Sequence, residues 1–179
     1  MTYICSYASP LGGITVASDG TAVTGLWFDS QKYFGSTITG ECVRSQVPAL
    51  EQACKWLDVY FGGSIPDFLP PLSMHDTPFR MAVWQALTDI PFGRTVSYGQ
   101  VASTVAQGMG LSCMSARAVG AAVGRNPISI IVPCHRVLAS DGSLRGYAGG
   151  VERKEWLLKM EGVNMSGPTT AGDGGGRRE

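Results

Sequence analysis

The sequence predicts an α/β (α+β) fold in two parts, a β-rich first third covered by a helix and a helical second part. Three observations predict this fold. Turn residues separate short β-prone runs near the N-terminus, apolar residues then recur with helical spacing, and a Gly- and Pro-rich stretch precedes a series of capped helices. With 44% hydrophobic and 16% charged residues, the 179-residue chain can bury a substantial core.

The β-prone runs of the first part cover residues 2–9, 14–18 and 21–28. Between them stand the turn sequences PLGG and DG, which are typical of antiparallel hairpins. We therefore expect a small sheet built from strands that are consecutive in the chain.

A helix is expected to cover that sheet, because apolar residues recur with helical spacing from Val47 to Phe61. Gly and Pro are then concentrated between residues 62 and 71, where neither a helix nor a central strand would tolerate them. These features predict an N-terminal domain with its linker over residues 1–73.

The second domain, residues 74–165, contains three helix starts that can be read from the sequence. Pro78 follows the cap residue Thr77, Ser97 has Gln100 three residues later, and Ser115 precedes an alanine-rich run. The helix after Ser97 is expected to reach about Ala106. With the next helix, at 116–123, it forms two short helices joined by a turn, as in a helix-turn-helix.

The end of the chain contains a last helix and a tail. The helix is expected from about Val151 to Glu161, with Gly162 closing it. Residues 166–179 contain five Gly and no Leu, Ile, Val or Phe, so we expect a disordered tail.

Composition excludes several classes of protein. No window approaches the roughly 18 apolar residues of a membrane helix, and the N-terminus lacks the features of a signal peptide, so we expect a cytoplasmic protein without membrane contact. Five cysteines without a Cys-x-x-Cys pair predict reduced thiols. With only two histidines, His75 and His135, we expect no metal site and no cofactor.

Charge is unevenly distributed although the net charge is zero. Residues 1–93 carry four basic and eight acidic groups, whereas residues 94–159 carry eight basic and three acidic groups. The second region could dock on phosphates, or it could be an ordinary solvated face.

Cys134 is the candidate nucleophile, because it lies between Pro133 and His135 at the end of an apolar run. A thiol reacts as the thiolate, which a neighbouring imidazole can promote by taking the proton. In an extended segment the two side chains would point to opposite faces, so their contact requires a kink or a bridging water. Glu161 is a plausible partner for the far nitrogen of the imidazole. The alternative is a buried structural cysteine beside a core histidine.

The helix at 116–124 is unusual because nearly all of its side chains are small. The minor groove of duplex DNA is only about 6 Å wide, so a helix that approaches it must have a small face. Arg117, at the start of this helix, could reach into the base stack. The alternative is a helix packed tightly against a neighbour.

Taken together, the motifs of the second half resemble those of one family. The sequence IVPCHRV around Cys134 resembles the active-site motif of the O6-alkylguanine-DNA alkyltransferases, or methylated-DNA-protein-cysteine methyltransferases. The flanking sequences FG and VSYG (92–99), ARAVG (116–120), RNP (125–127), GYAGG (146–150) and KEWLL (154–158) resemble further family motifs in the same order. The resemblance is strong over residues 78–163 and weak before them.

The resemblance implies a fold and a reaction. The fold is an N-terminal ribonuclease-H-like antiparallel sheet with a helix, followed by a helical domain carrying the helix-turn-helix. The reaction moves the alkyl group from O6 of guanine, and less readily from O4 of thymine, in duplex DNA to the cysteine sulfur. Because the product is a stable thioether, the protein reacts once and is consumed.

The resemblance also implies residue roles. Cys134 attacks, Tyr98 protonates the leaving guanine, His135 acts as base through a water, Glu161 orients His135, and Asn126 braces the turn. The partner is double-stranded DNA containing O6-alkylguanine, with the target nucleotide flipped out of the helix. The protein is expected to be a monomer in solution, with cooperative assembly on DNA left open. The expected DNA- and substrate-binding residues are Arg117, Ala118, Gly120, Val123, Tyr147, Ala148, Gly149, Arg80 and Ser140.

The sequence departs from the family pattern in two places. Ser129 stands where some members have proline, which bears on the acceptance of bulky adducts. Some relatives bind zinc in the N-terminal domain, where only Cys5 and His75 could match here.

Two rival functions remain. They are a cysteine hydrolase and a lesion-recognition protein without transfer activity. Recognition-only relatives lack the cysteine that this chain retains.

Overall fold

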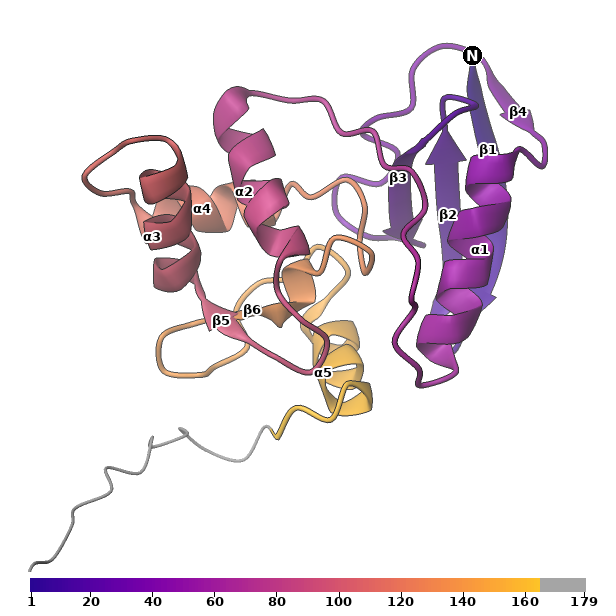
Figure 1. Cartoon of the computed structure of the whole chain (residues 1–179). Helices are drawn as coiled ribbons and strands as arrows, with labels where there is room; N and C mark the ends of the chain where they lie inside the picture. Colours follow the sequence, from indigo (N-terminus) through magenta and orange to yellow (C-terminus); the bar gives the residue numbers. More distant parts are fainter. Residues whose placement is uncertain (165–179) are drawn as a thin grey trace, which may run out of the picture.

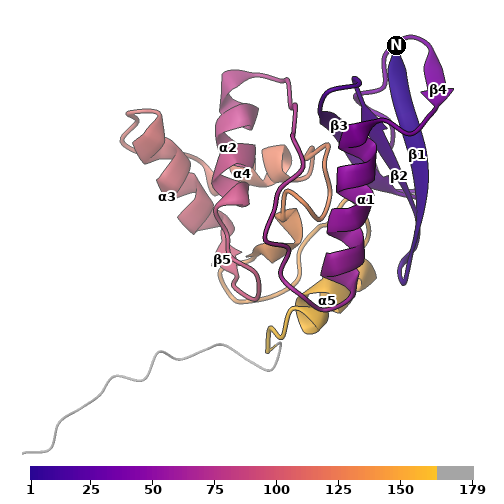
Figure 2. The same cartoon turned by 45° about the vertical axis from the view of Figure 1, so that its right-hand side comes forward.

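The computed structural model describes residues 1–164, so the prediction made for residues 166–179 lies outside the described part of the chain. A small sheet with one helix lies beside a group of helices (Figures 1 and 2). The elements in chain order are β1 (Thr2–Ser9), β2 (Gly12–Ser18), β3 (Val23–Phe28), β4 (Cys42–Arg44), α1 (Pro48–Phe61), α2 (Pro78–Thr88), β5 (Val96–Ser97), α3 (Tyr98–Gly108), α4 (Ala116–Val123), η1 (Cys134–Arg136), β6 (Val137–Leu138) and α5 (Val151–Met160).

The first three strands form the predicted antiparallel meander. β1 and β2 pair from Tyr3 opposite Ser18 to Ser9 opposite Gly12. At the turn, the Ser9 hydroxyl accepts from the Leu11 N–H at 3.1 Å and donates to the Gly12 carbonyl at 2.6 Å. Gly12 adopts a φ of +101°, which a side chain would disfavour.

A short fourth strand was not predicted. β4 pairs in parallel with β1, so the strand order is β3-β2-β1-β4 and one edge of the sheet is parallel. The strand has three residues, of which Cys42 and Arg44 are exposed. It is too short to produce an alternating hydrophobic pattern, and its pairing with β1 spans about forty residues of chain.

Helix α1 covers one face of the sheet (Figure 1), as its spacing predicts. It begins at Pro48, one residue after the expected start, because Val47 is the cap residue. Its buried side chains are Ala49, Leu50, Ala53, Trp56, Leu57 and Tyr60.

The end of the Gly- and Pro-rich stretch runs along β3 and forms backbone hydrogen bonds with it. The Val23 N–H donates to the Pro71 carbonyl at 2.7 Å, and the Ser73 N–H donates to the Val23 carbonyl at 2.8 Å. Further along β3, the Leu26 N–H donates to the Pro127 carbonyl at 2.9 Å. The edge of the sheet therefore binds backbone from the second half of the chain, and one hydrophobic cluster includes residues from both halves.

The helices of the second half begin at the predicted caps. Thr77 and Ser115 accept backbone N–H groups with their side chains, and Ser97 and Gln100 form the complete capping box. α3 extends to Gly108, two residues beyond the expected end. α3 and α4, joined by residues 109–115, form the predicted pair of short helices (Figure 1).

The segment around Cys134 differs from the extended conformation considered for it. Cys134–Arg136 forms a single 3₁₀ turn, and tight turns precede it. The Cys134 N–H donates to the Val132 carbonyl at 2.8 Å, and Ile130 has a positive φ of 70°. The backbone therefore already contains the kink that a contact between Cys134 and His135 would require.

Within residues 1–164, every helix is too short or too polar to cross a lipid bilayer.

Candidate active site

Cys134 lies at the wall of a cavity of about 600 Å³ between the sheet and the helices. Its side chain is nearly buried, with 4% of the residue exposed. The residues lining this cavity are Lys32, Tyr33, Arg80, Tyr98, Gly120, Ala121, Val123, Gly124, Arg125, Cys134, Gly146, Tyr147 and Ala148.

Asn126 holds the turn that carries the sulfur. Its Nδ2 donates to the Val132 carbonyl at 2.8 Å, to the Ile128 carbonyl at 3.3 Å and to Cys134 Sγ at 3.1 Å, and its Oδ1 accepts from the Ile128 N–H at 3.0 Å. One buried amide thus bridges the backbone before Cys134 and contacts the sulfur itself.

Two opposing effects act on the Cys134 thiol. Burial raises its pKa above the ordinary value, whereas the hydrogen bond from Asn126 and the charge of Lys154 favour the thiolate. The Lys154 ammonium is itself buried and donates to the carbonyls of Val137 at 2.6 Å and Arg145 at 3.2 Å. Burial lowers the pKa of Lys154 to about 8, with the neighbouring Cys134 acting in the opposite direction. A nearby base is therefore needed for efficient ionisation of Cys134.

His135 can supply that base. Its Nε2 lies 2.7 Å from Glu161 Oε1, and its Nδ1 is buried without a hydrogen-bond partner in the described chain. Burial lowers the pKa of His135 below its usual value, although Glu161 acts in the opposite direction, so the imidazole is neutral at pH 7. Because an ionised carboxylate can only accept, Nε2 carries the proton and Nδ1 carries the free lone pair.

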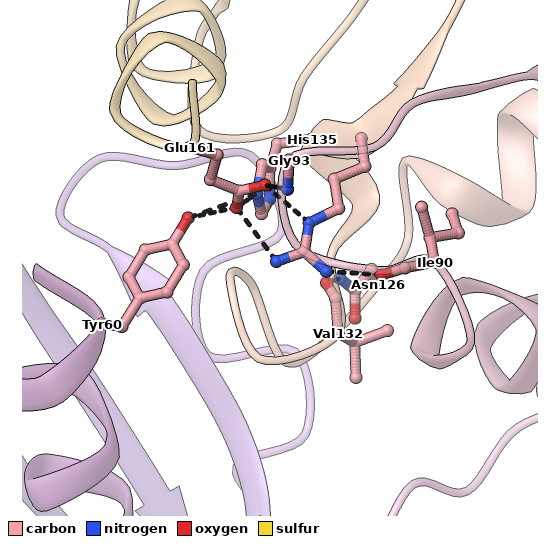
Figure 3. Close-up of polar contacts among 8 residues, drawn as sticks. Tyr60, Ile90, Gly93, Asn126, Val132, His135 and Glu161 are labelled. Carbon is pink, nitrogen blue, oxygen red and sulfur yellow. Dashed lines mark hydrogen bonds and ion pairs between the residues drawn. The ribbon is translucent and has the colours of Figure 1, made fainter. Parts of the chain in front are cut away.

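Glu161 is the centre of a buried polar network, shown in Figure 3. Besides His135, it accepts from Arg136 Nε at 2.9 Å, from Arg136 Nη2 at 3.0 Å and from the Gly93 N–H at 3.0 Å. Burial acts to raise the pKa of Glu161, but His135 and Arg136 outweigh it and hold the pKa at about 2. Gly93 is required here, because a Cβ would lie 2.8 Å from the Glu161 carbonyl oxygen and its φ is +70°.

Tyr60 belongs to the same network but was not predicted from the sequence. Its hydroxyl donates to Glu161 Oε1 at 2.6 Å and lies 3.4 Å from His135 Nε2 (Figure 3). Burial, followed by the negative charge of Glu161, raises its pKa well above 10, so the hydroxyl keeps its proton. The only sequence signal was its place on the apolar face of α1, which equally describes a core residue.

Most of the residues predicted to bind substrate reach the cavity. Gly120, Val123, Tyr147 and Ala148 line it. The Tyr98 hydroxyl donates to the Arg145 carbonyl at 2.9 Å, the same oxygen that Lys154 contacts. Burial and the neighbouring Cys134 raise the pKa of Tyr98.

Gly149 was expected among the DNA- and substrate-binding residues, but it is not one of the residues that line this cavity. Gly149 lines a separate hollow near Leu11 and Arg153, and its backbone packs against the rings of Phe28 and Tyr147. The chain turns away from the cavity after Ala148, whose carbonyl accepts from the Lys32 N–H at 3.0 Å.

The remaining predicted DNA-binding residues lie on the neighbouring surface. Arg117 and Ala118 are exposed on α4, and Arg117 and Ser140 line a shallow hollow beside Tyr98. Arg80 lines the Cys134 cavity, but its guanidinium is paired with Asp76 at 2.9 Å.

Two cavity residues from the sheet domain were not predicted. Lys32 and Tyr33 line the cavity from the loop after β3, and Arg125 stacks on the Tyr33 ring at 3.9 Å. Ser129 is buried and donates to Gln31 Oε1 of the same loop at 3.1 Å.

The structure also places the residues considered for zinc. Among residues 1–164 there is no cluster of three or more His, Cys, Asp or Glu side chains suited to a metal ion. His75 pairs with the Ser73 hydroxyl at 2.9 Å, and Cys5 lies beside Cys54.

Comparison with known proteins agrees with this arrangement. Residues 2–74 match the ribonuclease-like domain of 6-O-methylguanine DNA methyltransferase, and residues 78–163 match the DNA-binding domain of that protein. The methylated-DNA–protein-cysteine methyltransferase of Mycobacterium leprae is 42% identical over 162 residues, covering 90% of this chain and 93% of its own. The Haemophilus influenzae protein of the same name is 36% identical, covering 90% of this chain and 87% of its own.

Solved structures give the same result. The Mycobacterium tuberculosis protein OGT in complex with DNA matches with a TM-score of 0.77 and 38% identity, covering 89% of this chain and 92% of its own. The O6-methylguanine-DNA methyltransferase of Pyrococcus kodakaraensis matches with a TM-score of 0.63 and 28% identity, covering 91% of this chain and all of its own. Both domains match the family models and the Mycobacterium leprae relative is 42% identical over most of the chain, so this chain belongs to the 6-O-methylguanine DNA methyltransferase family.

Proposed function

We propose that this chain repairs duplex DNA by moving an alkyl group from O6 of guanine, and less readily from O4 of thymine, to the sulfur of its own Cys134. The observation that carries this proposal is the position of Cys134, in a turn held by Asn126 and facing a cavity. Membership of the family supports the same chemistry.

The proposed proton path begins at the thiol. The free Nδ1 lone pair of His135 takes the Cys134 proton through a bridging water, while Nε2 continues to donate to Glu161. The positive charge that develops on the imidazole is stabilised by the ionised Glu161 beside it. Tyr60 and Arg136 keep that carboxylate in place through their own hydrogen bonds.

The transfer step is an in-line displacement at the alkyl carbon. The thiolate of Cys134 forms the new S–C bond with its electron pair, and the C–O bond breaks with its electrons on the guanine. The guanine takes a proton from the hydroxyl of Tyr98, which lines the same cavity. When Tyr98 gives up this proton, its hydrogen bond to the Arg145 carbonyl breaks. The thioether that remains on Cys134 offers water no acyl carbon, so each protein molecule reacts once.

Access to the base requires nucleotide flipping, which costs a few kcal/mol. We assign α4 to the minor groove, because Ala118 and Ala121 are exposed on it and add little width. Arg117 then fills the vacated place in the base stack. Ser140 and Arg80 contact the DNA backbone, and Arg80 exchanges its Asp76 partner for a phosphate.

The proposal includes the organisation of the protein. Residues 1–73 form the sheet domain, and residues 74–165 bind DNA and accept the alkyl group in the cytoplasm or wherever the DNA resides. A monomer is sufficient for transfer, because one chain supplies the cysteine, the base and the cavity walls. Cooperative assembly along DNA would then affect how lesions are found and not the transfer step.

The decisive experiment is mass spectrometry after incubation with a duplex containing one O6-methylguanine. We expect a gain of one methyl group, saturating at one per protein and located on the peptide that carries Cys134. Cys134→Ser should gain none, whereas the matched control Cys42→Ser, which removes an exposed thiol, should react like the wild type.

Other outcomes would point to the rival functions. Tight, lesion-dependent DNA binding without a mass gain would indicate a recognition protein. Continued product release from an ester or amide would indicate a hydrolase. Either result would overturn the transfer proposal.

A further inference from the structure

Outside the active site, two thiols meet between the sheet and helix α1. Cys5 on β1 and Cys54 on α1 are 49 positions apart in the sequence, yet their sulfur atoms lie 3.7 Å apart. Of the other cysteines, Cys42 and Cys113 are exposed and Cys134 is buried at the active site. A disulfide bond requires about 2.05 Å, so the two sulfur atoms must move closer before they can bond.

A second contact holds the two elements in this register. The Tyr7 hydroxyl donates to Asp58 Oδ1 at 2.9 Å. Tyr7 follows Cys5 by two residues on the same face of the strand, and Asp58 follows Cys54 by four residues on the same face of the helix. The two side-chain pairs are therefore parallel cross-links between β1 and α1, and the tyrosine link keeps the sulfurs adjacent.

The thiols are also accessible and unequally ionised. Both residues are partly exposed, so a small reagent can approach them. The hydrogen bond between the thiols lowers the pKa of Cys54, against the effects of burial and of the carboxylates of Asp58 and Glu51, and the same bond raises the pKa of Cys5. Either sulfur can donate to the other, so the thiolate of one is stabilised by a hydrogen bond from its partner, and we take Cys54 as the attacking thiol.

We propose that Cys5 and Cys54 form a reversible oxidation site, which a low-molecular-weight disulfide such as glutathione disulfide converts to an internal disulfide bond. The Cys54 thiolate attacks one sulfur of the reagent, forming a mixed disulfide and releasing one thiolate, which takes up a proton. Cys5 then loses its proton and attacks the sulfur of Cys54, releasing the second thiol. Two protein thiols are oxidised and one reagent disulfide is reduced to two thiols.

The expected consequence is a more stable sheet domain with an unchanged active site. The new bond closes a large loop between β1 and α1, which restricts the unfolded chain. Tyr7 and Asp58 already hold β1 and α1 in this register, so the bond should leave Tyr60 in place and transfer activity should stay within about twofold of the reduced protein, a free-energy change well below 1 kcal/mol.

The test is oxidation of the full chain with glutathione disulfide, followed by peptide mapping without reduction. We expect a linked peptide containing Cys5 and Cys54 and full reversal by dithiothreitol. The melting temperature should rise by about 5 to 10 °C on oxidation. Cys54→Ser and Cys5→Ser should each lose the linked peptide and the temperature shift, whereas Cys42→Ser should keep both.

Two results would overturn the proposal. One is glutathione retained on Cys5 or Cys54 in place of the linked peptide, which would show that the sulfurs cannot close to bonding distance. The other is a linked peptide that joins different cysteines. Neither result depends on alkyl transfer, so the proposal can fail while the proposed repair function stands.

Discussion

Tyr60 on helix α1 donates a hydrogen bond of 2.6 Å to Glu161, which follows α5 and lies 101 positions later in the chain. The contact joins the helix that covers the sheet to the carboxylate that holds the active-site histidine. The sheet domain therefore contributes directly to the buried network around His135.

The role of Tyr60 can be measured with Tyr60→Phe. Removing a hydrogen bond to a buried carboxylate should lower the free energy of unfolding by about 2 kcal/mol. Glu161 would then attract the proton of His135 more strongly, so the acid limb of the transfer-rate profile should move to higher pH, with a rate loss of about 3- to 10-fold at pH 7. Single-turnover rates on methylated duplex across pH would measure both effects.

Tyr7→Phe is the matched control for that variant. It also removes a tyrosine hydroxyl that donates to a carboxylate, but the Tyr7–Asp58 pair lies on the surface. Stability should change by less than about 1 kcal/mol, and the pH profile of transfer should not move. If the pH profiles of Tyr60→Phe and the wild type were equal, Tyr60 would have no influence on His135 through Glu161.

Asn126 is expected to control both the turn and the thiol. Asn126→Ala leaves the buried Ile128 N–H unpaired and removes one of the two hydrogen bonds to the Val132 carbonyl, so we expect a loss of about 2 kcal/mol in stability and at least a tenfold loss in rate. Asn126→Asp keeps the acceptor for Ile128 but places a carboxylate beside Cys134, whose negative charge should raise the pKa of the thiol further. Thiol reactivity as a function of pH would separate the two variants, and an unchanged thiol pKa in both would contradict the assignment.

Arg117 is expected to act on DNA and not on stability. It is exposed at the start of α4, so Arg117→Ala should leave unfolding within about 0.5 kcal/mol of the wild type. Transfer from duplex DNA should fall by about 10- to 100-fold, because the vacated stack is no longer filled, whereas transfer from a free alkylated base should be unchanged.

Arg44→Ala provides the comparison for Arg117. It removes the same exposed charge from β4, on the far edge of the sheet. Its transfer rate on duplex DNA should equal that of the wild type. If both variants lost the same factor, the effect of Arg117 would be one of general charge and not of its place on α4.

Acid should weaken the fold through Glu161. Its folded pKa of about 2 lies below the ordinary value of 4.5, so its contribution is complete above pH 4.5 and is lost as the pH falls toward 2. The shift corresponds to about 3 kcal/mol. The lowered pKa of His135 also makes the fold less stable as the pH falls, because the unfolded chain binds that proton at a higher pH than the folded chain.

Denaturant unfolding at a series of pH values would test this linkage. Glu161→Gln should be less stable than the wild type at pH 7, because Arg136 loses its charged partner, and its stability should fall less steeply below pH 4.5. Parallel pH dependence in the two proteins would show that Glu161 is not the group responsible.

Local signals in the sequence were sufficient for most secondary structure. The caps at Thr77, Ser97 and Ser115 and the hairpin turns involve hydrogen bonds between residues a few positions apart, so the sequence predicts them directly. β4 was missed because its stability depends on pairing with β1, about forty positions away.

The residues of the site that lie in contiguous sequence motifs could be predicted from the sequence. Cys134, His135 and Asn126 stand in or beside one motif, and the resemblance to a family assigned their roles. Tyr33 at the cavity wall and Tyr60 beside Glu161 belong to no such motif. Their positions in the sequence carry only the signals of an ordinary loop and of an ordinary core face of a helix.

The fold class, the helix starts, the candidate nucleophile and the resemblance to a family could all be read from the sequence. The convergence of Tyr60, His135 and Arg136 on Glu161, the burial of Lys154 near Cys134 and the turn of Gly149 away from the cavity became visible only in the folded chain. The two sets of features differ in the sequence separation of the residues that make them. Capping and turn formation depend on neighbouring residues, whereas a buried network closes only when distant segments pack and exclude water from their polar groups.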